Sequence, residues 1–78
     1  YVYVIRSINY PQQIYVGRTV DLKKRLSNHN SGTTPHTAKY KPWELVVQLG
    51  FKDELKSIAF EQYLKSGSGR AFRDKRFL

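Results

Sequence analysis

Several side chains in this sequence have the chemistry needed to break a phosphodiester bond. That reaction requires a deprotonated water, positive charge against the transition state, and assistance to the leaving oxygen. Tyr3 or Tyr15 could activate the water if nearby cations lower the phenol pKa from about 10. Arg25 could neutralise phosphate oxygens with its planar guanidinium, and His29 could donate to the phosphate or transfer a proton.

A carboxylate completes this set, because Glu61 could bind Mg2+ or Mn2+ through its oxygens. Glu61 also lies one helical turn before Lys65, and such a pair stabilises a helix by only about 0.2–0.5 kcal/mol. Helix geometry by itself favours this solvated ion pair over a metal ligand. A role as ligand therefore depends on which groups the fold brings beside the carboxylate.

Other catalytic schemes lack their residues. The sequence has no cysteine, which excludes disulfides and thiolate metal sites. It contains neither a G-x-S-x-G elbow nor an H-E-x-x-H motif, so a serine triad and a zinc hydrolase fit poorly. A phosphate-binding P-loop is also missing, since residues 67–69 are too few for one and suit a turn between helices.

The charge balance indicates a polyanionic partner. Fourteen Lys and Arg against six Asp and Glu give a formal net charge of +8, and aromatic residues are interleaved with these cations. On a small folded domain this pattern is typical of nucleic-acid binding, with aromatic faces available to stack on bases. The alternatives are a basic protein without a particular partner and one that touches anionic lipid. No segment suits a membrane span or a signal peptide, so we expect a soluble cytoplasmic protein.

The catalytic candidates must be positioned by a small number of elements, because the 78 residues have room for one domain, residues 1–78. Residues 1–7 alternate and are rich in β-branched and aromatic side chains, which predicts a strand. A polar loop with a proline then leads to a second strand, residues 14–18. Tyr3 and Tyr15 lie within reach of each other if they share a face, which the sequence leaves open because it does not fix the register.

A helix capped by Asp21 follows the hairpin and ends near Gly32. Two leucines one turn apart on this helix can face a core. Arg25 and His29, also one turn apart, occupy a neighbouring stripe. That layout suits gripping a phosphate, and the alternative is a surface helix whose cations face water.

The next segment, residues 33–42, is predicted to be a loop. It carries three side chains that suit contact with backbone phosphate: His36, Lys39 and Lys41. Residues 43–49 then form a third strand that is largely apolar on both faces, so helices should cover it.

Two helices complete the chain. Asp53 is placed to cap the first, residues 54–66. A turn at residues 68–69 separates it from a short basic helix, residues 70–78. Together these elements predict a compact α+β fold.

Two short signatures lie on the predicted hairpin, Tyr1-Val2-Tyr3 and Tyr15-Val16-Gly17. Further segments follow in order: Gly17-Arg18-Thr19, Asp21-Leu22-Lys23-Lys24-Arg25-Leu26, His29-Asn30, Trp43-Glu44-Leu45-Val46, Ala59-Phe60-Glu61 and Leu64-Lys65-Ser66-Gly67-Ser68-Gly69-Arg70. In this order and spacing the set resembles the GIY-YIG nuclease domain family over essentially the whole chain. It is most similar to the small stand-alone bacterial members and more distantly to the N-terminal nuclease of excinuclease C.

The resemblance implies a three-stranded antiparallel sheet flanked by helices, and metal-dependent cleavage of DNA. It implies a catalytic set of Tyr3, Tyr15, Arg25, His29 and Glu61, with Glu61 as the ligand of Mg2+ or Mn2+ rather than a surface ion-pair partner. We expect Tyr3 to be the general base and Tyr15 to orient the water or the phosphate. The cations expected to bind nucleic acid are Arg18, Lys24, Lys39, Lys41, Arg70 and Arg73.

Two features depart from the family pattern. The first signature begins with Tyr1 rather than glycine. Many members carry an asparagine after the glutamate, whereas none occurs between Glu61 and Leu78, and Arg70 or Arg73 occupies that region instead.

The leading hypothesis is therefore a GIY-YIG-type endonuclease of DNA repair or recombination, without a small-molecule cofactor. We expect it to select branched or damaged DNA by structure, because so short a chain has no module for reading a long sequence. The alternative is a nucleic-acid-binding module with weak or lost catalysis. The two differ in whether Glu61, Arg25 and both signature tyrosines converge on one cleft.

Overall fold

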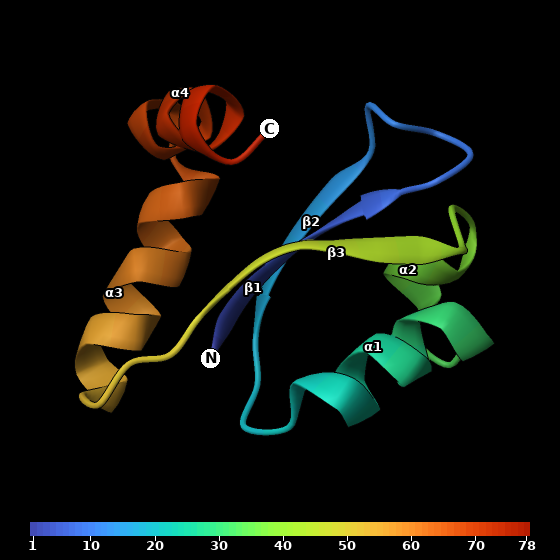
Figure 1. Ribbon diagram of the computed structural model, residues 1–78, viewed down its shortest axis with the longest axis horizontal. Helices are drawn as coiled ribbons and strands as arrows, with labels where there is room; N and C mark the ends of the chain where they lie inside the picture. Colours follow the sequence, from blue (N-terminus) through green and yellow to red (C-terminus); the bar gives the residue numbers. More distant parts are fainter.

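The computed structural model describes residues 1–78, which form one three-stranded sheet with helices on both sides (Figure 1). The elements in chain order are β1 (Val2–Ser7), β2 (Ile14–Arg18), α1 (Leu22–Ser31), α2 (Pro35–Ala38), β3 (Trp43–Leu49), α3 (Glu54–Lys65) and α4 (Gly67–Arg76). All strand pairs are antiparallel, which confirms the expected α+β class and sheet. None of the helices has the length and apolar character needed to cross a membrane.

Strand β1 is the centre of the sheet, between β2 and β3 (Figure 1). In the β1–β2 ladder Tyr3 lies opposite Gly17, and Ile5 lies opposite Tyr15. Since residues two apart on a strand share a face and paired residues do too, this register brings Tyr3 and Tyr15 to the same face. The structure thereby answers the question that the sequence left open.

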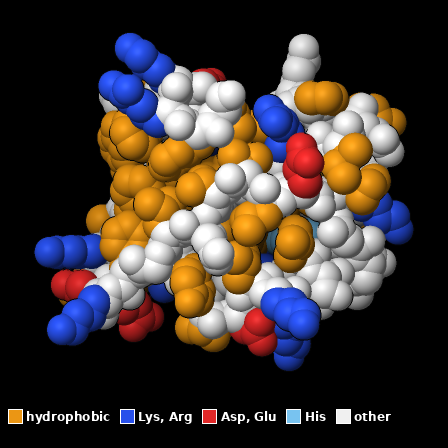
Figure 2. All heavy atoms as spheres, viewed as in Figure 1, with side chains coloured by type: hydrophobic (Ala, Val, Ile, Leu, Met, Phe, Trp, Pro, Cys, Tyr) orange, Lys and Arg blue, Asp and Glu red, His pale blue; other side chains and the backbone are white.

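The sheet separates two hydrophobic clusters. Tyr3, Ile5 and Trp43 pack on the face covered by α1. Val4 and Leu64 belong to the opposite cluster, which aromatic side chains of α3 and α4 extend. Figure 2 shows hydrophobic side chains gathered over α3 and α4, with Lys and Arg side chains projecting around their margin. Because both faces of β1 are covered, its apolar residues do not alternate with polar ones.

The helix ends follow the predicted capping residues. Asp21 Oδ1 accepts from the backbone N–H of Lys24 at 3.1 Å and so caps α1. Asp53 Oδ1 does the same for α3 through Leu55, at 2.9 Å. Gly32 ends α1 with φ of 84°, in the left-handed region that favours glycine.

The expected loop at residues 33–42 contains a short helix, α2, and this corrects the sequence analysis. Pro35 occupies the first helical position, where the missing N–H costs no hydrogen bond. The backbone N–H groups of Thr37 and Ala38 donate to the Thr34 carbonyl at 3.1 and 3.0 Å. The proline was a helix-start signal, but four residues are too few to show a helical period.

The last helix also differs from the prediction, since α4 begins at Gly67 rather than at residue 70. Ser66 Oγ accepts from the backbone N–H of Gly69 at 3.1 Å, so a serine cap starts α4 directly after α3. A Cβ at Gly69 would overlap the carbonyl of Tyr63. The glycine therefore allows the close approach of two helices rather than forming a turn between them.

Leu64→Ala should lower the free energy of unfolding by about 2–5 kcal/mol, because Leu64 is completely buried under the sheet and its loss leaves a cavity. The matched control is Leu55→Ala on the same helix, where 75% exposure predicts a change below about 0.5 kcal/mol. Urea unfolding followed by circular dichroism measures both. Equal effects would mean that α3 does not pack on the sheet as described.

Candidate active site

Tyr3 lies at the centre of the site, on the middle strand. It is 0% exposed, and its cross-strand neighbour is Gly17. A Cβ at Gly17 would overlap the Tyr3 hydroxyl. The glycine of the second signature is thus required by packing, because the phenol fills the space that any larger residue would need.

A continuous series of hydrogen bonds joins Tyr3 to α1 and α2. Arg25 Nε donates to the Tyr3 hydroxyl oxygen at 3.2 Å. The same hydroxyl is 2.8 Å from His29 Nε2, and His29 Nδ1 is 2.7 Å from Thr37 Oγ1. Arg25 and His29 therefore face the sheet together, which rules out the alternative of a surface helix whose cations simply face water.

Tyr15 from β2 lies beside this series. Its ring centroid is 4.9 Å from that of His29 and 6.3 Å from that of Tyr3. Tyr15 is half-buried, unlike the sealed Tyr3. Tyr3, Tyr15, Arg25 and His29 thus lie together in one cluster.

The surroundings shift three pKa values in this cluster. Burial raises the pKa of Tyr3, against the opposing hydrogen bond from Arg25. Burial, reinforced by the charge of Arg25, lowers the pKa of His29. The hydrogen bond to Tyr3 raises the pKa of Arg25. Near neutral pH the cluster therefore holds a protonated Tyr3, a neutral imidazole and a charged guanidinium.

The burial of Tyr3 and His29 bears on the roles expected for them. Tyr3, expected to be the general base, is sealed from solvent and has a raised pKa, so its hydroxyl connects hydrogen-bond partners instead of meeting water. His29, expected to donate to the phosphate or transfer a proton, is 0% exposed and has both ring nitrogens hydrogen-bonded. No atom of its ring is available to a phosphate. Among the phenols of the cluster, Tyr15 is the one with solvent access.

Glu61 reaches the cluster through its charge rather than through a hydrogen bond. Its side chain is 20% exposed, and its negative charge contributes to the raised pKa of Tyr3. The ion pair that helix spacing predicted is present, with Lys65 Nζ 3.3 Å from Glu61 Oε2. Because Lys65 is 53% exposed, this pair contributes little to stability. The carboxylate is partly buried and within electrostatic reach of the phenol.

Glu61 is the carboxylate within electrostatic reach of the cluster, and its oxygens are hard donors of the kind that Mg2+ and Mn2+ prefer. No group of three His, Cys, Asp or Glu side chains converges anywhere in the chain, so the soft, multi-ligand arrangement of zinc sites is not offered. A single carboxylate suits Mg2+ or Mn2+, since Mg2+ usually retains several waters and takes further oxygens from a phosphate substrate.

Three of the cations expected to bind nucleic acid lie on the α1 and α2 side of the molecule. Lys24 lines an open hollow next to Arg25. Lys39 and Lys41 are exposed after α2, and Lys39 Nζ lies 5.6 Å from the ring centroid of Tyr40. A cation and an aromatic ring are thus presented together to solvent.

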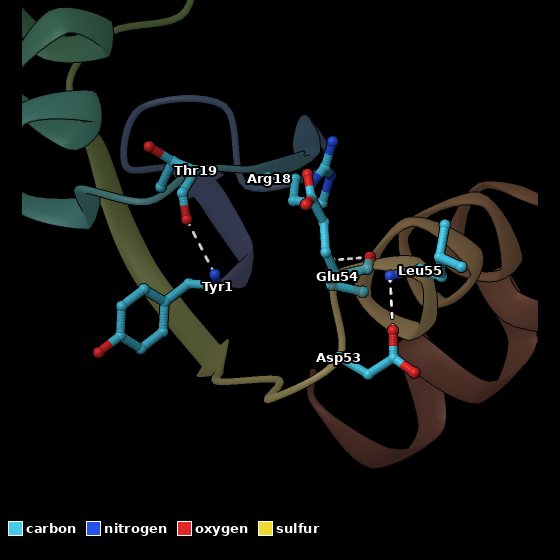
Figure 3. A network of polar contacts seen from close by, with 7 residues as sticks. Tyr1, Arg18, Thr19, Asp53, Glu54 and Leu55 are labelled. Atoms are coloured by element: carbon cyan, nitrogen blue, oxygen red, sulfur yellow. Dashed lines mark hydrogen bonds and ion pairs between the residues drawn. The ribbon is translucent and has the colours of Figure 1, made fainter.

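The other three cations lie nearer to α3 and α4. Arg18 Nη1 is 3.7 Å from Glu54 Oε1, where the end of β2 meets the start of α3 (Figure 3). Arg70 is exposed, whereas Arg73 is only 14% exposed and bonds Asp74 through Nε at 3.0 Å. Of Arg70 and Arg73, Arg70 is the one free to meet a phosphate backbone.

Thr37 is a member of the cluster that the sequence analysis missed. It is 1% exposed, and α2 carries it to His29. Its chemistry gave no signal, because a threonine side chain carries no charge and the segment was predicted to be a loop. The helix-start pattern at Pro35 was the one available indication that this segment is structured.

Comparison with known proteins gives a family. The model of the GIY-YIG catalytic domain matches residues 1–75. The chain is 37% identical over 71 residues to "Structure-specific endonuclease subunit SLX1" of Candida dubliniensis, covering 82% of this chain and 25% of that protein. It is 39% identical over 64 residues to the protein of the same name in Malassezia globosa, covering 76% and 14%.

A bacterial relative completes the comparison. The chain is 43% identical over 49 residues to a UPF0213 protein of Streptococcus pyogenes, covering 63% of this chain and 48% of that protein. The chain thus spans a quarter or less of the two fungal relatives and about half of the bacterial one. No solved structure matches it.

The buried neutral His29 should make stability depend on pH. Above about pH 6.5 the imidazole is neutral in both states, and below it the unfolded chain takes up a proton that the folded chain, with its lowered pKa, does not. The free energy of unfolding should therefore decrease as pH falls from about 7 to about 5. Urea unfolding at a series of pH values measures this slope.

His29→Gln should flatten the slope, whereas His36→Gln, at an exposed position, should retain it. If the two variants keep the same slope as the unmodified chain, His29 is not the group that causes the pH dependence.

Proposed function

The chain belongs to the GIY-YIG catalytic domain family, and on this basis we propose that it is an endonuclease that hydrolyses phosphodiester bonds in DNA with a divalent cation. The observation that carries the proposal is the cluster in which Arg25 bonds Tyr3 while Tyr3 bonds His29, beside the half-buried Tyr15. These groups come from three different elements. Their convergence on one place is what a catalytic site needs and what a merely basic surface lacks.

Arg25 is the group suited to hold the scissile phosphate. Its Nε is used by Tyr3, which leaves the terminal N–H groups for phosphate oxygens. Arg25 lines a hollow together with Lys24 and Asn28, so the guanidinium has an approach from solvent. Fixed positive charge at this point would stabilise the negative charge that the phosphate gains in the transition state.

Tyr15 is the group suited to the attacking water. As the water oxygen bonds to phosphorus and the bond to the leaving oxygen breaks, the water must lose a proton. Tyr15 has solvent access next to Arg25, so its phenolic oxygen can orient the water, and in the deprotonated (phenolate) form it can accept this proton and become the phenol. Tyr3 and His29 act from the buried side, because they hold Arg25 in place without meeting the substrate.

Glu61 would hold the divalent cation, Mg2+ or Mn2+. When bound, such a cation supplies positive charge to the phosphate and favours deprotonation of water. Lys65 neutralises Glu61 until then and, being exposed, can turn away into solvent. The carboxylate is therefore available to a cation of higher charge.

DNA is the substrate that the charge favours, and its structure rather than its sequence should be recognised. The net charge of +8 includes exposed cations on both sides of the sheet. Contacts to phosphate position a protein on DNA without reading bases. Two relatives are named structure-specific endonuclease subunits, which supports selection of branched or damaged DNA in repair or recombination.

A second candidate is a nucleic-acid-binding module with weak or lost catalysis. The ion pair between Glu61 and Lys65 favours it, because this pair occupies one of the carboxylate oxygens. The lack of an asparagine after Glu61 favours it as well. In this case the exposed cations would bind DNA, and the cluster around Tyr3 would only stabilise the fold.

Glu61→Gln should abolish nicking of branched DNA while leaving DNA binding largely intact, because the amide keeps the shape but loses the charge that holds a cation. The assay compares branched, nicked and linear DNA with Mg2+, with Mn2+ and with a chelator. Glu44→Gln is the matched control, since Glu44 lies on β3 and pairs with Arg6 away from the cluster. Chelator-resistant cleavage, or full activity of Glu61→Gln, would remove the proposed role of Glu61.

Arg25→Ala should lower kcat by about 100-fold or more, as loss of one transition-state donor commonly does. Lys23→Ala, at an exposed position two residues earlier on α1, is the control and should keep kcat unchanged. Steady-state nicking kinetics separate an effect on kcat from an effect on KM. An effect of Arg25→Ala on KM alone would mean that Arg25 only binds the substrate.

A further inference from the structure

We propose that Thr37, from the short helix α2, is a positioning residue that fixes the tautomer of His29 and thereby holds Tyr3 and Arg25 in their working arrangement. The inference concerns how the site is built, and its catalytic consequence rests on the proposed function. Four hydrogen bonds run inward from Arg25 to the carbonyl of Thr34, the N-cap residue of α2.

The two bonds made by His29 are the shortest of the series, and the groups between the ends of the series are sealed from solvent. From Arg25 Nε to Tyr3 the distance is 3.2 Å, from Tyr3 to His29 Nε2 it is 2.8 Å, and from His29 Nδ1 to Thr37 Oγ1 it is 2.7 Å. Thr37 Oγ1 then lies 3.3 Å from the carbonyl oxygen of Thr34. Tyr3 and His29 are 0% exposed, and Thr37 is 1% exposed. Water therefore cannot supply a missing donor or acceptor within the series.

The two ends of the series fix the direction of every proton in it. The Thr34 carbonyl can only accept, so the Thr37 hydroxyl donates to it, and Thr37 Oγ1 accepts from His29 Nδ1–H. His29 Nε2 is then the unprotonated nitrogen, and it accepts a hydrogen bond from the Tyr3 O–H. This leaves the Tyr3 oxygen to accept from Arg25 Nε, which can only donate.

The opposite tautomer would leave a buried group without a partner. With the proton on Nε2, Tyr3 would receive hydrogen bonds from both His29 and Arg25, and its own O–H would have no acceptor in the series. Thr37 would have to turn its proton to Nδ1 and abandon the Thr34 carbonyl. The arrangement with Nδ1–H satisfies every member, and no buried side-chain polar atom of the chain is left unpaired.

Helix α2 is itself held in place, so Thr37 can serve as a fixed reference. The Thr37 carbonyl accepts from the indole Nε1 of Trp43 at 2.8 Å. Trp43 starts β3, and its backbone N–H donates to Asn30 Oδ1 at 2.6 Å. The short helix is thus tied to Trp43 of β3, and Trp43 is tied to Asn30 of α1, which is next to His29.

The consequence for the reaction concerns the orientation of Arg25. As long as Tyr3 presents an acceptor to Nε, this hydrogen bond fixes one edge of the guanidinium. Without the Thr37 hydroxyl, the imidazole can carry its proton on either nitrogen, and the Tyr3 hydroxyl loses its defined direction. Loss of this hydroxyl should therefore impair the chemical step more than substrate binding.

The test uses Thr37→Val, which keeps the shape and removes the hydroxyl, and Thr37→Ser, which restores a hydroxyl. Thr33→Val, at an exposed position in the same segment, is the control. The 15N and 1H NMR spectra of the histidine rings report the tautomer directly, with the exposed His36 as an internal reference. Nicking kinetics with Mg2+ report kcat and KM for the same proteins.

We expect the neutral His29 ring to carry its proton on Nδ1 in the unmodified chain and in Thr37→Ser. In Thr37→Val the proton should either exchange between Nδ1 and Nε2 or lie on Nε2. The kcat of Thr37→Val should fall about tenfold or more, as for other residues that orient a functional histidine. KM should stay unchanged, and Thr37→Ser and Thr33→Val should retain activity.

An Nε2–H tautomer in the unmodified chain would overturn the proposal, and this spectrum needs no variant to fold. Unchanged tautomer and kcat in Thr37→Val would overturn it as well. If Thr37→Val shifts the tautomer but none of the proteins nicks DNA, the proposed endonuclease function fails while the tautomer assignment stands.

Discussion

A phenol hydroxyl that is sealed from solvent must satisfy its proton and its oxygen inside the protein, and the fold around Tyr3 provides for both. Gly17 leaves room for the hydroxyl, Arg25 donates to its oxygen, and His29 accepts its proton. One buried group thereby connects β1, β2 and α1. The position of Arg25 depends on these bonds.

The two faces of the sheet are packed in different ways. On the α3 and α4 face, Leu64 and aromatic side chains pack against valines of β1 in an apolar cluster. On the α1 face the cluster is mixed, since Ile5 and Trp43 surround a core that also contains hydrogen-bonded polar groups. Such a polar network has one satisfied arrangement, so it fixes geometry more strictly than apolar packing does.

Much of this molecule was accessible from its sequence. Alternation in residues 1–7, the caps Asp21 and Asp53, and the glycine at the end of α1 predicted elements that the structure contains. These signals are local, because a strand face or a capping hydrogen bond involves residues a few positions apart. The ordered signatures also indicated the family, which the match over residues 1–75 confirms.

Other features were decided only by tertiary structure. The β1–β2 register brought Tyr15 to the face of Tyr3, and the packing of α1 on the sheet buried both Tyr3 and His29. The role of Thr37 depends on a four-residue helix whose place is set by Trp43. The sequence determined which side chains capable of taking part in a reaction are present. The solvent access of these side chains, the direction of their hydrogen bonds and the identity of their hydrogen-bond partners arise from contacts between distant segments. No local pattern encodes them.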